Sequence, residues 1–281
     1  SIIGELNIVG TFNNQDSGTI INTGNIENKT NGTFVSPGTI DNRLSLINNS
    51  TFVTSGSLLN KTTGIIINYL TMNNNTGGSI VSGGSFTNAY AAAFNNYAAV
   101  VNDSVMIGSG TIKNFKAATV TNNNELRVKK IFKNYGTITN NKTFTTYDST
   151  TMENYNLITN SATGTIETNH SFTNKKINAT NIDSINLTGI IATINNSGNL
   201  LHKKSTYTNN GTISNLTTGI ITNKDSLILG STGIIINNNT LTNDSICTNN
   251  GEIVNNSGKT ITNNDTLTNN NIINNAGIFN N

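Results

Sequence analysis

Apolar residues recur along this chain every five to eight positions, and Thr, Asn, Ser or Gly residues separate them. In the last third the inward candidates are Ile213, Ile221, Leu227, Ile235, Leu241, Ile246, Ile253, Ile261, Leu267 and Ile273. Every third residue of this series is separated from the last by about twenty positions, as Ile221, Leu241 and Ile261 are. Such a period, filled with β-branched residues and Gly/Asn turns, predicts three short strands per repeat.

We therefore expect an all-β fold, a single-stranded parallel β-solenoid (β-helix) with about 20 residues per coil. One coil cannot bury its own apolar face, so neighbouring coils supply both the core and the backbone hydrogen bonds. About thirteen coils, stacked about 4.8 Å apart, would form one continuous rod over residues 1–281. Irregular coils are expected near 89–106, as a bulged loop or a short helical insertion, and near 124–134, where charges gather.

Asn is the most prominent polar residue, at 58 of 281 positions. In a solenoid each corner stacks on the same corner of the next coil. We expect Asn to adopt left-handed backbone conformations there and its side-chain amide to bond the amides above and below it. Gly should supply the left-handed conformation in "SGTI" (17–20), "TGTI" (163–166) and "NGTI" (210–213).

Charge changes this picture little. Charged residues make up 11% of the chain and the formal net charge is +2, so no nucleic-acid partner is implied. No apolar run has the length of a membrane span, and no membrane insertion is expected. Cys247 is the single cysteine, which excludes an intramolecular disulfide, and we expect it to be a small core residue.

Three aspartates raise the question of a metal. Asp225, Asp244 and Asp265 recur at close to the period of the coils and are expected at one corner. A column of carboxylates would repel itself unless it were solvated or bridged by a cation such as Ca²⁺. Ordinary solvated turn residues are the simpler interpretation, and no other cofactor is indicated.

Catalysis is not expected. Polysaccharide lyases and hydrolases with a β-helix need paired carboxylates in one groove, whereas this chain has 14 Asp and Glu residues in all. His170 and His202 lie far apart and have no evident nucleophile partner. Without Trp and with few Tyr, a platform for stacking sugars is also poorly supplied.

A Thr array raises the alternative of an ice-binding solenoid. Thr240 and Thr242 lie one coil before Thr260 and Thr262. The array then fails, because the preceding coil offers Ile220 at the first of these positions.

The phrases "NNGTISNLTTGIITNKDSL" (209–227) and "NNGEIVNNSGKTITNNDTL" (249–267) resemble the repeat region of filamentous-haemagglutinin-like bacterial β-solenoid adhesins. The resemblance implies a shaft or adhesive rod at the cell surface or outside the cell, with no catalytic residues to transfer. The Asn-Pro motifs of that family's secretion domain are missing, since Pro37 is the single proline.

We expect a non-catalytic extracellular structural protein that forms a surface fibre or filament. The first and last coils do not look capped, so the ends either join head to tail or adjoin sequence outside this chain. The alternative function is the shaft of a cell-surface adhesin that binds a surface glycan or protein.

Overall fold

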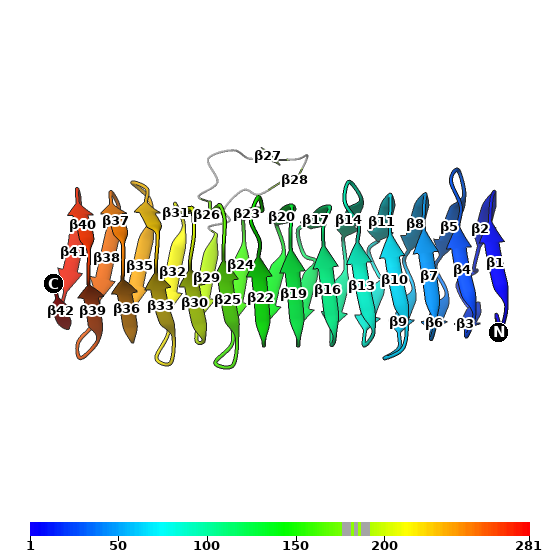
Figure 1. The fold of residues 1–281 in the computed structure, drawn as a ribbon, viewed down its shortest axis with the longest axis horizontal. Helices are drawn as coiled ribbons and strands as arrows, with labels where there is room; N and C mark the ends of the chain where they lie inside the picture. The colour runs from blue at the N-terminus through cyan, green and yellow to red at the C-terminus, as the bar shows by residue number, and fades with distance from the viewer. Residues whose placement is uncertain (176–180, 183–184, 187–191) are drawn as a thin grey trace. The chain divides into compact units, whose positions relative to one another are not determined.

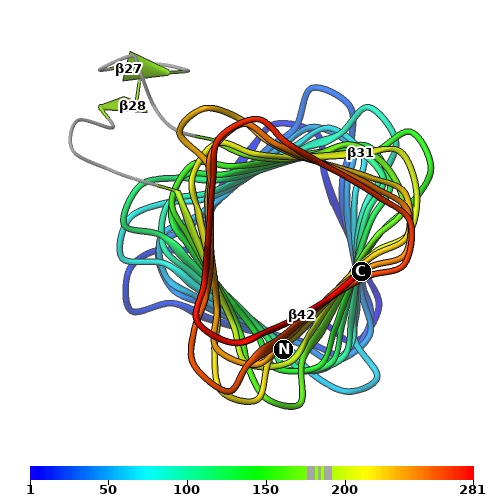
Figure 2. The same ribbon diagram turned by 90° about the vertical axis from the view of Figure 1, so that its left-hand side faces the viewer.

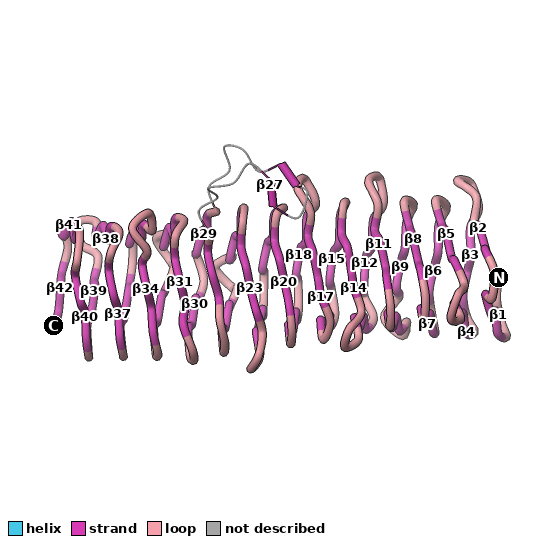
Figure 3. The backbone as a smooth tube through the Cα atoms, turned by 90° about the horizontal axis from the view of Figure 1, so that it is seen from above, coloured by secondary structure: helices cyan, strands magenta, loops and turns pink. Residues whose placement is uncertain are grey.

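The structure is a computed structural model, which describes residues 1–175, 181–182, 185–186 and 192–281. The chain forms two compact units, residues 1–132 and 133–281. In each unit short parallel strands stack into three sheets, which we call A, B and C (Figure 1). No helix lies in the described part of the chain, as Figure 3 shows by its colours.

In unit 1 the chain passes from sheet B to C to A and then repeats. Sheet B contains β1 (Glu5–Ile8), β4 (Asn25–Asn28), β7 (Ser45–Asn48), β10 (Ile65–Asn68), β13 (Ser85–Asn88), β16 (Val105–Gly108) and β19 (Glu125–Val128). Sheet C contains β2 (Thr11–Asn13), β5 (Thr33–Ser36), β8 (Thr51–Thr54), β11 (Thr71–Asn74), β14 (Ala93–Asn96) and β17 (Thr111–Asn114). Sheet A contains β3 (Thr19–Asn22), β6 (Thr39–Asn42), β9 (Ser57–Asn60), β12 (Ser79–Ser82), β15 (Ala99–Asn102) and β18 (Thr119–Asn122).

Unit 2 follows the same order, and Figure 2 shows its last coils, in red, as a three-sided outline. Sheet B contains β22 (Thr143–Thr146), β25 (Thr165–Thr168), β30 (Asn199–His202), β33 (Ile220–Asn223), β36 (Thr240–Asn243), β39 (Thr260–Asn263) and β42 (Ile278–Asn280). Sheet C contains β23 (Thr151–Asn154), β26 (Phe172–Asn174), β31 (Thr206–Asn209), β34 (Ser226–Leu229), β37 (Ile246–Asn249) and β40 (Thr266–Asn269). Sheet A contains β21 (Thr137–Asn140), β24 (Leu157–Asn160), β29 (Thr193–Asn196), β32 (Thr212–Asn215), β35 (Ile234–Asn237), β38 (Glu252–Asn255) and β41 (Ile272–Asn275).

Three further strands lie outside these sets. β20 (Ile131–Asn134) spans the boundary between the units, and β27 (Asn181–Ile182) pairs antiparallel with β28 (Ile185–Asn186). The predicted fold class is confirmed: the described residues form a parallel β-solenoid with three strands per coil and about thirteen coils. That all coils belong to one continuous rod stays a prediction.

A simple local rule produces these coils. Most strands have four residues, of which the second and fourth point inward, as Ile40 and Asn42 do in β6. Corners of two or four residues join most strands, so the coils differ in length. Thus Asn215 bonds Asn237 after 22 residues, and Asn237 bonds Asn255 after 18 residues.

The predicted core positions fall into three groups in the structure. Ile213, Ile221, Leu227, Ile235, Leu241, Ile253 and Ile261 are buried. Leu267 and Ile273 lie in the last coil and are partly exposed. The prediction for Ile246 was wrong: it is 48% exposed, and Cys247 is buried in its place. Because side chains alternate between the two faces of a strand, this slip of one residue reverses the assignment.

The stretches expected to be irregular have ordinary strands. Within 89–106, β14 to β16 keep the alternating burial of their neighbours, and the four-residue corner 89–92 precedes them. In 124–134, β19 and β20 do the same.

The fourth position of most strands is occupied by Asn. Asn residues there stack into ladders along the axis of each unit, in which the Nδ2 of one coil donates to the Oδ1 of the next. In sheet A of unit 2 the ladder joins Asn140, Asn160, Asn196, Asn215, Asn237, Asn255 and Asn275, at 2.7–2.9 Å. The predicted amide ladder is confirmed.

Each ladder amide also serves the backbone at its corner. Asn237 Nδ2 lies 3.0 Å from the carbonyl oxygen of Thr260 and 3.2 Å from that of Asn239. The Asn239 carbonyl oxygen also accepts from the backbone N–H of Thr260 at 3.0 Å, so Nδ2 is a second donor to it. The amide gains from these contacts, because an unpaired buried polar group costs about 1–3 kcal/mol. The ladder thus satisfies the buried Nδ2 groups. The Oδ1 atoms of Asn28, Asn74 and Asn102 have no partner among the described residues, because the preceding coil has no Asn at this position.

The expected left-handed conformation of these Asn residues was wrong. Among the described non-glycine residues only Asn31, Ala91, Ala117, Ser149 and Ser205 have positive φ, and none of them is a ladder Asn. The corner glycines also differ from expectation, because positive φ occurs only at Gly77 and Gly258 in the described residues.

Most corner glycines are required because the backbones of neighbouring coils approach closely. A Cβ on Gly84 would lie 2.1 Å from the carbonyl oxygen of Gly64 and 2.3 Å from that of Lys61. On Gly83, the preceding residue, the nearest atom would be the carbonyl oxygen of Asn60 at 3.4 Å.

This pair of glycines gives a matched test. Gly84→Ala should lower the free energy of unfolding by about 1–3 kcal/mol, because backbone atoms must shift to admit the methyl group. Gly83→Ala should change it by less than about 0.5 kcal/mol. Urea denaturation of the two variants measures the difference, and equal losses would contradict the close-approach explanation.

Candidate functional site

In unit 2 the Asn ladder of sheet B begins differently from those of sheets A and C. Its fourth positions are Thr146, Thr168 and His202, and only then Asn223 and Asn243. This interruption places the one buried imidazole of the described residues inside the solenoid, with 4% of its surface exposed.

His202 takes the place of an amide in this ladder. Its Nε2 lies 2.9 Å from the carbonyl oxygen of Ser205, and its Nδ1 lies 2.9 Å from Thr168 Oγ1. A carbonyl oxygen can only accept, so Nε2 carries the proton and Nδ1 accepts from the threonine hydroxyl. Burial lowers the pKa of His202, against the opposing effects of the Ser205 carbonyl and of Asp225. The neutral imidazole is therefore the stable form at pH 7.

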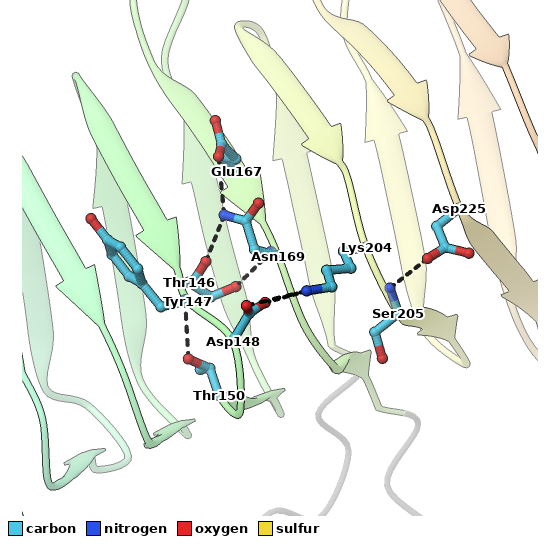
Figure 4. A network of polar contacts seen from close by, with 9 residues as sticks. All are labelled: Thr146, Tyr147, Asp148, Thr150, Glu167, Asn169, Lys204, Ser205 and Asp225. Carbon is cyan, nitrogen blue, oxygen red and sulfur yellow. Dashed lines mark hydrogen bonds and ion pairs between the residues drawn. The ribbon is translucent and has the colours of Figure 1, made fainter.

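Polar contacts tie the outer side of this corner across coils (Figure 4). Asp225 Oδ2 accepts from the backbone N–H of Ser205 at 2.7 Å, and Lys204 Nζ lies 3.0 Å from Asp148 Oδ1. The Lys204–Asp148 pair is exposed on both sides, so it contributes little to stability. These contacts fix the backbone of a corner in which Ser205 has a φ of 72°.

A second cluster lies on the outer face of sheet C in unit 2. Glu153 is paired with Lys175 and lies 3.6 Å from Lys133, and its Oε2 accepts from the Tyr155 hydroxyl at 3.0 Å. Burial alone would raise the pKa of Glu153, but its hydrogen bonds and the lysine charges together lower it. A carboxylate held ionised in this way is an acceptor in an ion-pair network, and it is unsuited to act as a general acid.

The three aspartates do not share one corner position. The Thr266 N–H donates to the Ser245 carbonyl and the Ile246 N–H to the Asp225 carbonyl. Ser245 therefore stands one coil after Asp225, and Asp265 one coil after Ser245. Asp244 belongs to the neighbouring column, where Asn264 Nδ2 donates to its Oδ1 at 2.7 Å. The expected carboxylate column was wrong for the same reason as Ile246, a slip of one residue.

No group of three His, Cys, Asp or Glu side chains suited to a metal occurs among the residues that the structure describes. His170 lies at the corner before β26, two residues after Thr168, and Thr168 pairs with His202 of the next coil. The two histidines, far apart in the sequence, therefore belong to neighbouring coils. Burial raises the pKa of the Cys247 thiol to about 12, so the thiol is neutral and shielded. The cavity beside His202 and Tyr207 has a volume of about 10 Å³, which is room for one water molecule at most.

The Thr array is confirmed in register but is short. Thr240 and Thr242 pair with Thr260 and Thr262, while the flanking coils present Ile220 and Ile278 at the first position. An outward isoleucine on either side limits the regular hydroxyl surface to two coils.

Comparison of the chain with protein-family models, curated proteins and solved structures found no match. Within the described ranges, no helix has the length and apolarity needed to cross a membrane.

His202 makes the stability of unit 2 sensitive to pH. Its ordinary pKa is about 6.5, and the folded state lowers it. As the pH falls through 6.5, the unfolded chain takes up a proton that the buried site resists, so stability is lost on acidification. At pH 5.5 this loss is at most about 1.4 kcal/mol relative to pH 7.5.

The variant His202→Asn should abolish that loss, because Asn occupies the equivalent position in the following coils. Thermal unfolding at pH 7.5 and 5.5 measures it, with His170→Asn as the control that keeps the buried imidazole. If the native chain and His202→Asn lose stability equally between these pH values, the assignment is wrong.

Proposed function

We propose that this chain is a non-catalytic structural protein whose coils continue from one copy to the next, forming a fibre outside the cell or at its surface. The observation that carries the proposal is the outermost coil of unit 2. Leu267, Ile273 and Phe279 point inward there but are partly exposed, whereas their predecessors Cys247 and Ile253 are buried.

The Asn side chains of this coil also lack some of the hydrogen bonds that the preceding coils make. Within the part of the chain that the structure describes, Asn269 Nδ2 bonds only the carbonyl oxygen of Asn271 in its own corner, and Asn275 Nδ2 only that of Gly277. One coil earlier, Asn255 Nδ2 also reaches Asn275 Oδ1 and the Ile278 carbonyl. A further coil, of a second copy or of sequence beyond this chain, would satisfy the donors of the last one; we assign that coil to a second copy.

The first coil of unit 1 also leaves inward-facing apolar side chains partly exposed. Leu6 and Phe12 are partly exposed, which gives apolar side chains to face Phe279 and Leu267 of another copy. Each ladder Nδ2 donates toward the following coil, so donors are left at Asn269 and Asn275 of the last coil. Amide acceptors are left at Asn14 and Asn22 of the first coil, whereas β1 has Ile8 at this position. Unpaired strand edges also associate with other chains unless they are covered. This polarity favours head-to-tail stacking over other arrangements.

The resemblance to the repeats of bacterial β-solenoid adhesins supports a place outside the cell or on its surface. An adhesin shaft that binds a surface glycan or protein is the second candidate function. It is favoured by one surface feature of unit 1, the partly exposed ring of Tyr97 beside a polar hollow.

Electron microscopy and sedimentation of the purified chain test the proposal over a range of concentrations. Filaments that lengthen with concentration are expected. Ile273→Lys should abolish them, because it places a charge on the stacking surface. Ile272→Lys alters the adjacent, outward-facing residue, which is 45% exposed, and should leave assembly intact.

Circular dichroism of both variants should show unchanged β structure, since the substitutions lie in the last coil. Discrete particles at every concentration would overturn the proposal. So would equal effects of the two lysine substitutions.

A further inference from the structure

Unit 1 presents an aromatic platform at one corner between sheets C and A. Tyr97 follows β14 and Phe115 follows β17, one coil later. Their rings are stacked, with centroids 4.0 Å apart and planes inclined by 21°. Phe115 covers one face of Tyr97, so the exposed 38% of Tyr97 lies on its other face and its hydroxyl edge.

The corner one coil before Tyr97 is longer than the corner that contains it, so it projects further from the coils. The corner Tyr97–Ala98 has two residues, whereas the corner before it, Asn75–Gly78, has four. Gly77 adopts a φ of 87° in that longer corner, a conformation that glycine adopts readily. The insertion of two residues therefore makes the surface uneven next to Tyr97.

An open hollow of about 440 Å³ lies at this place, lined by Ser55, Asn73, Asn75, Thr76 and Tyr97. Its size falls within the range of sites for small molecules, roughly 300–1,000 Å³. The lining contains amides, hydroxyls and one aromatic ring, and it contains no charged residue.

The polar side chains of the hollow are available to a ligand. Asn95 Nδ2 donates to Asn73 Oδ1 at 2.9 Å, which fixes the Asn73 amide so that its Nδ2 remains a donor. Within the described residues, no protein partner of the Thr76 hydroxyl is found. In another four-residue corner, by contrast, the Thr63 hydroxyl donates to the carbonyl oxygen of Arg43 at 2.8 Å.

We propose that this hollow binds a neutral saccharide, one sugar ring of which packs its C–H face on Tyr97 while its hydroxyls bond Asn73, Asn75 and Thr76. An aromatic face gives apolar contact without a charge, and amides both donate to and accept from hydroxyl groups. The lack of a cation in the lining disfavours a phosphate or a carboxylate as the bound group. The site lies within unit 1 and does not depend on the stacking of copies.

The sequence alone offered little reason to expect this platform, because Trp is absent and Tyr is scarce. The structure concentrates two of the few aromatic residues at one corner by placing positions 97 and 115 one coil apart. A single supported ring beside amides is sufficient for a weak site of the kind that repeated copies would strengthen.

The test uses the full chain and a panel of neutral disaccharides: cellobiose, maltose, lactose, chitobiose and mannobiose. Saturation-transfer difference NMR should identify at least one that binds, with the strongest transfer to ring C–H protons. Tyr97→Ala should weaken its binding about tenfold or more, and Asn73→Ala severalfold. Tyr97→Phe should keep most of the affinity because the ring face remains.

Tyr69→Ala is the matched control. Tyr69 is 50% exposed but lies at the corner after β10, away from the hollow, and its loss should leave binding unchanged. Thermal unfolding of each variant shows whether the coils remain folded. The proposal is overturned if no disaccharide of the panel binds, or if binding is unaffected by Tyr97→Ala or equally reduced by Tyr69→Ala.

Discussion

The cost of burying an unpaired amide organises this protein. Most strands bury an Asn amide at their fourth position, and corner carbonyl oxygens, such as that of Asn239, accept from its Nδ2. That Asn must then find an acceptor for itself, which is the Asn of the next coil, as in Asn215 and Asn237. Because each amide depends on its neighbour, the coils must stack in parallel and in register, and the apolar residue two positions earlier, such as Ile235, is carried into the core.

This constraint also explains which features can vary. Corners can gain two residues without disturbing either inward position, so coils of 18 residues and 22 residues coexist in one solenoid. The long corner Asn75–Gly78 alters the outer surface while Asn74 keeps its bond to Asn96 at 2.8 Å. Function can therefore diverge at the corners while the ladder maintains the fold. The saccharide site that we propose uses this freedom, whereas the proposed fibre uses the ladder itself.

The sequence was sufficient for the fold class, the period and the amide ladder, because apolar residues and Asn recur visibly. It failed where two apolar residues were adjacent, as at Ile246 and Cys247. Counting back two positions from Asn249 would have identified Cys247 as the inward residue. The position of Asn therefore predicts the inward residues better than apolar character does. The stacking of Tyr97 on Phe115 could not be predicted in this way, because it required the exact length of each corner between them. The buried His202 was seen in the sequence, but its place in a ladder follows only from its register with Thr168.

Hydrogen exchange of the Asn side chains tests the central claim most directly. In a chain labelled with ¹⁵N at Asn, NMR can follow the Nδ2 protons of ladder residues such as Asn160 and Asn237, with Asn31 at an exposed corner for comparison. If the ladders hold the coils together, the ladder amides should exchange as slowly as the backbone N–H groups of the strands. Exchange as fast as that of Asn31 would contradict the account, and stacking of the apolar residues alone would then have to explain the fold.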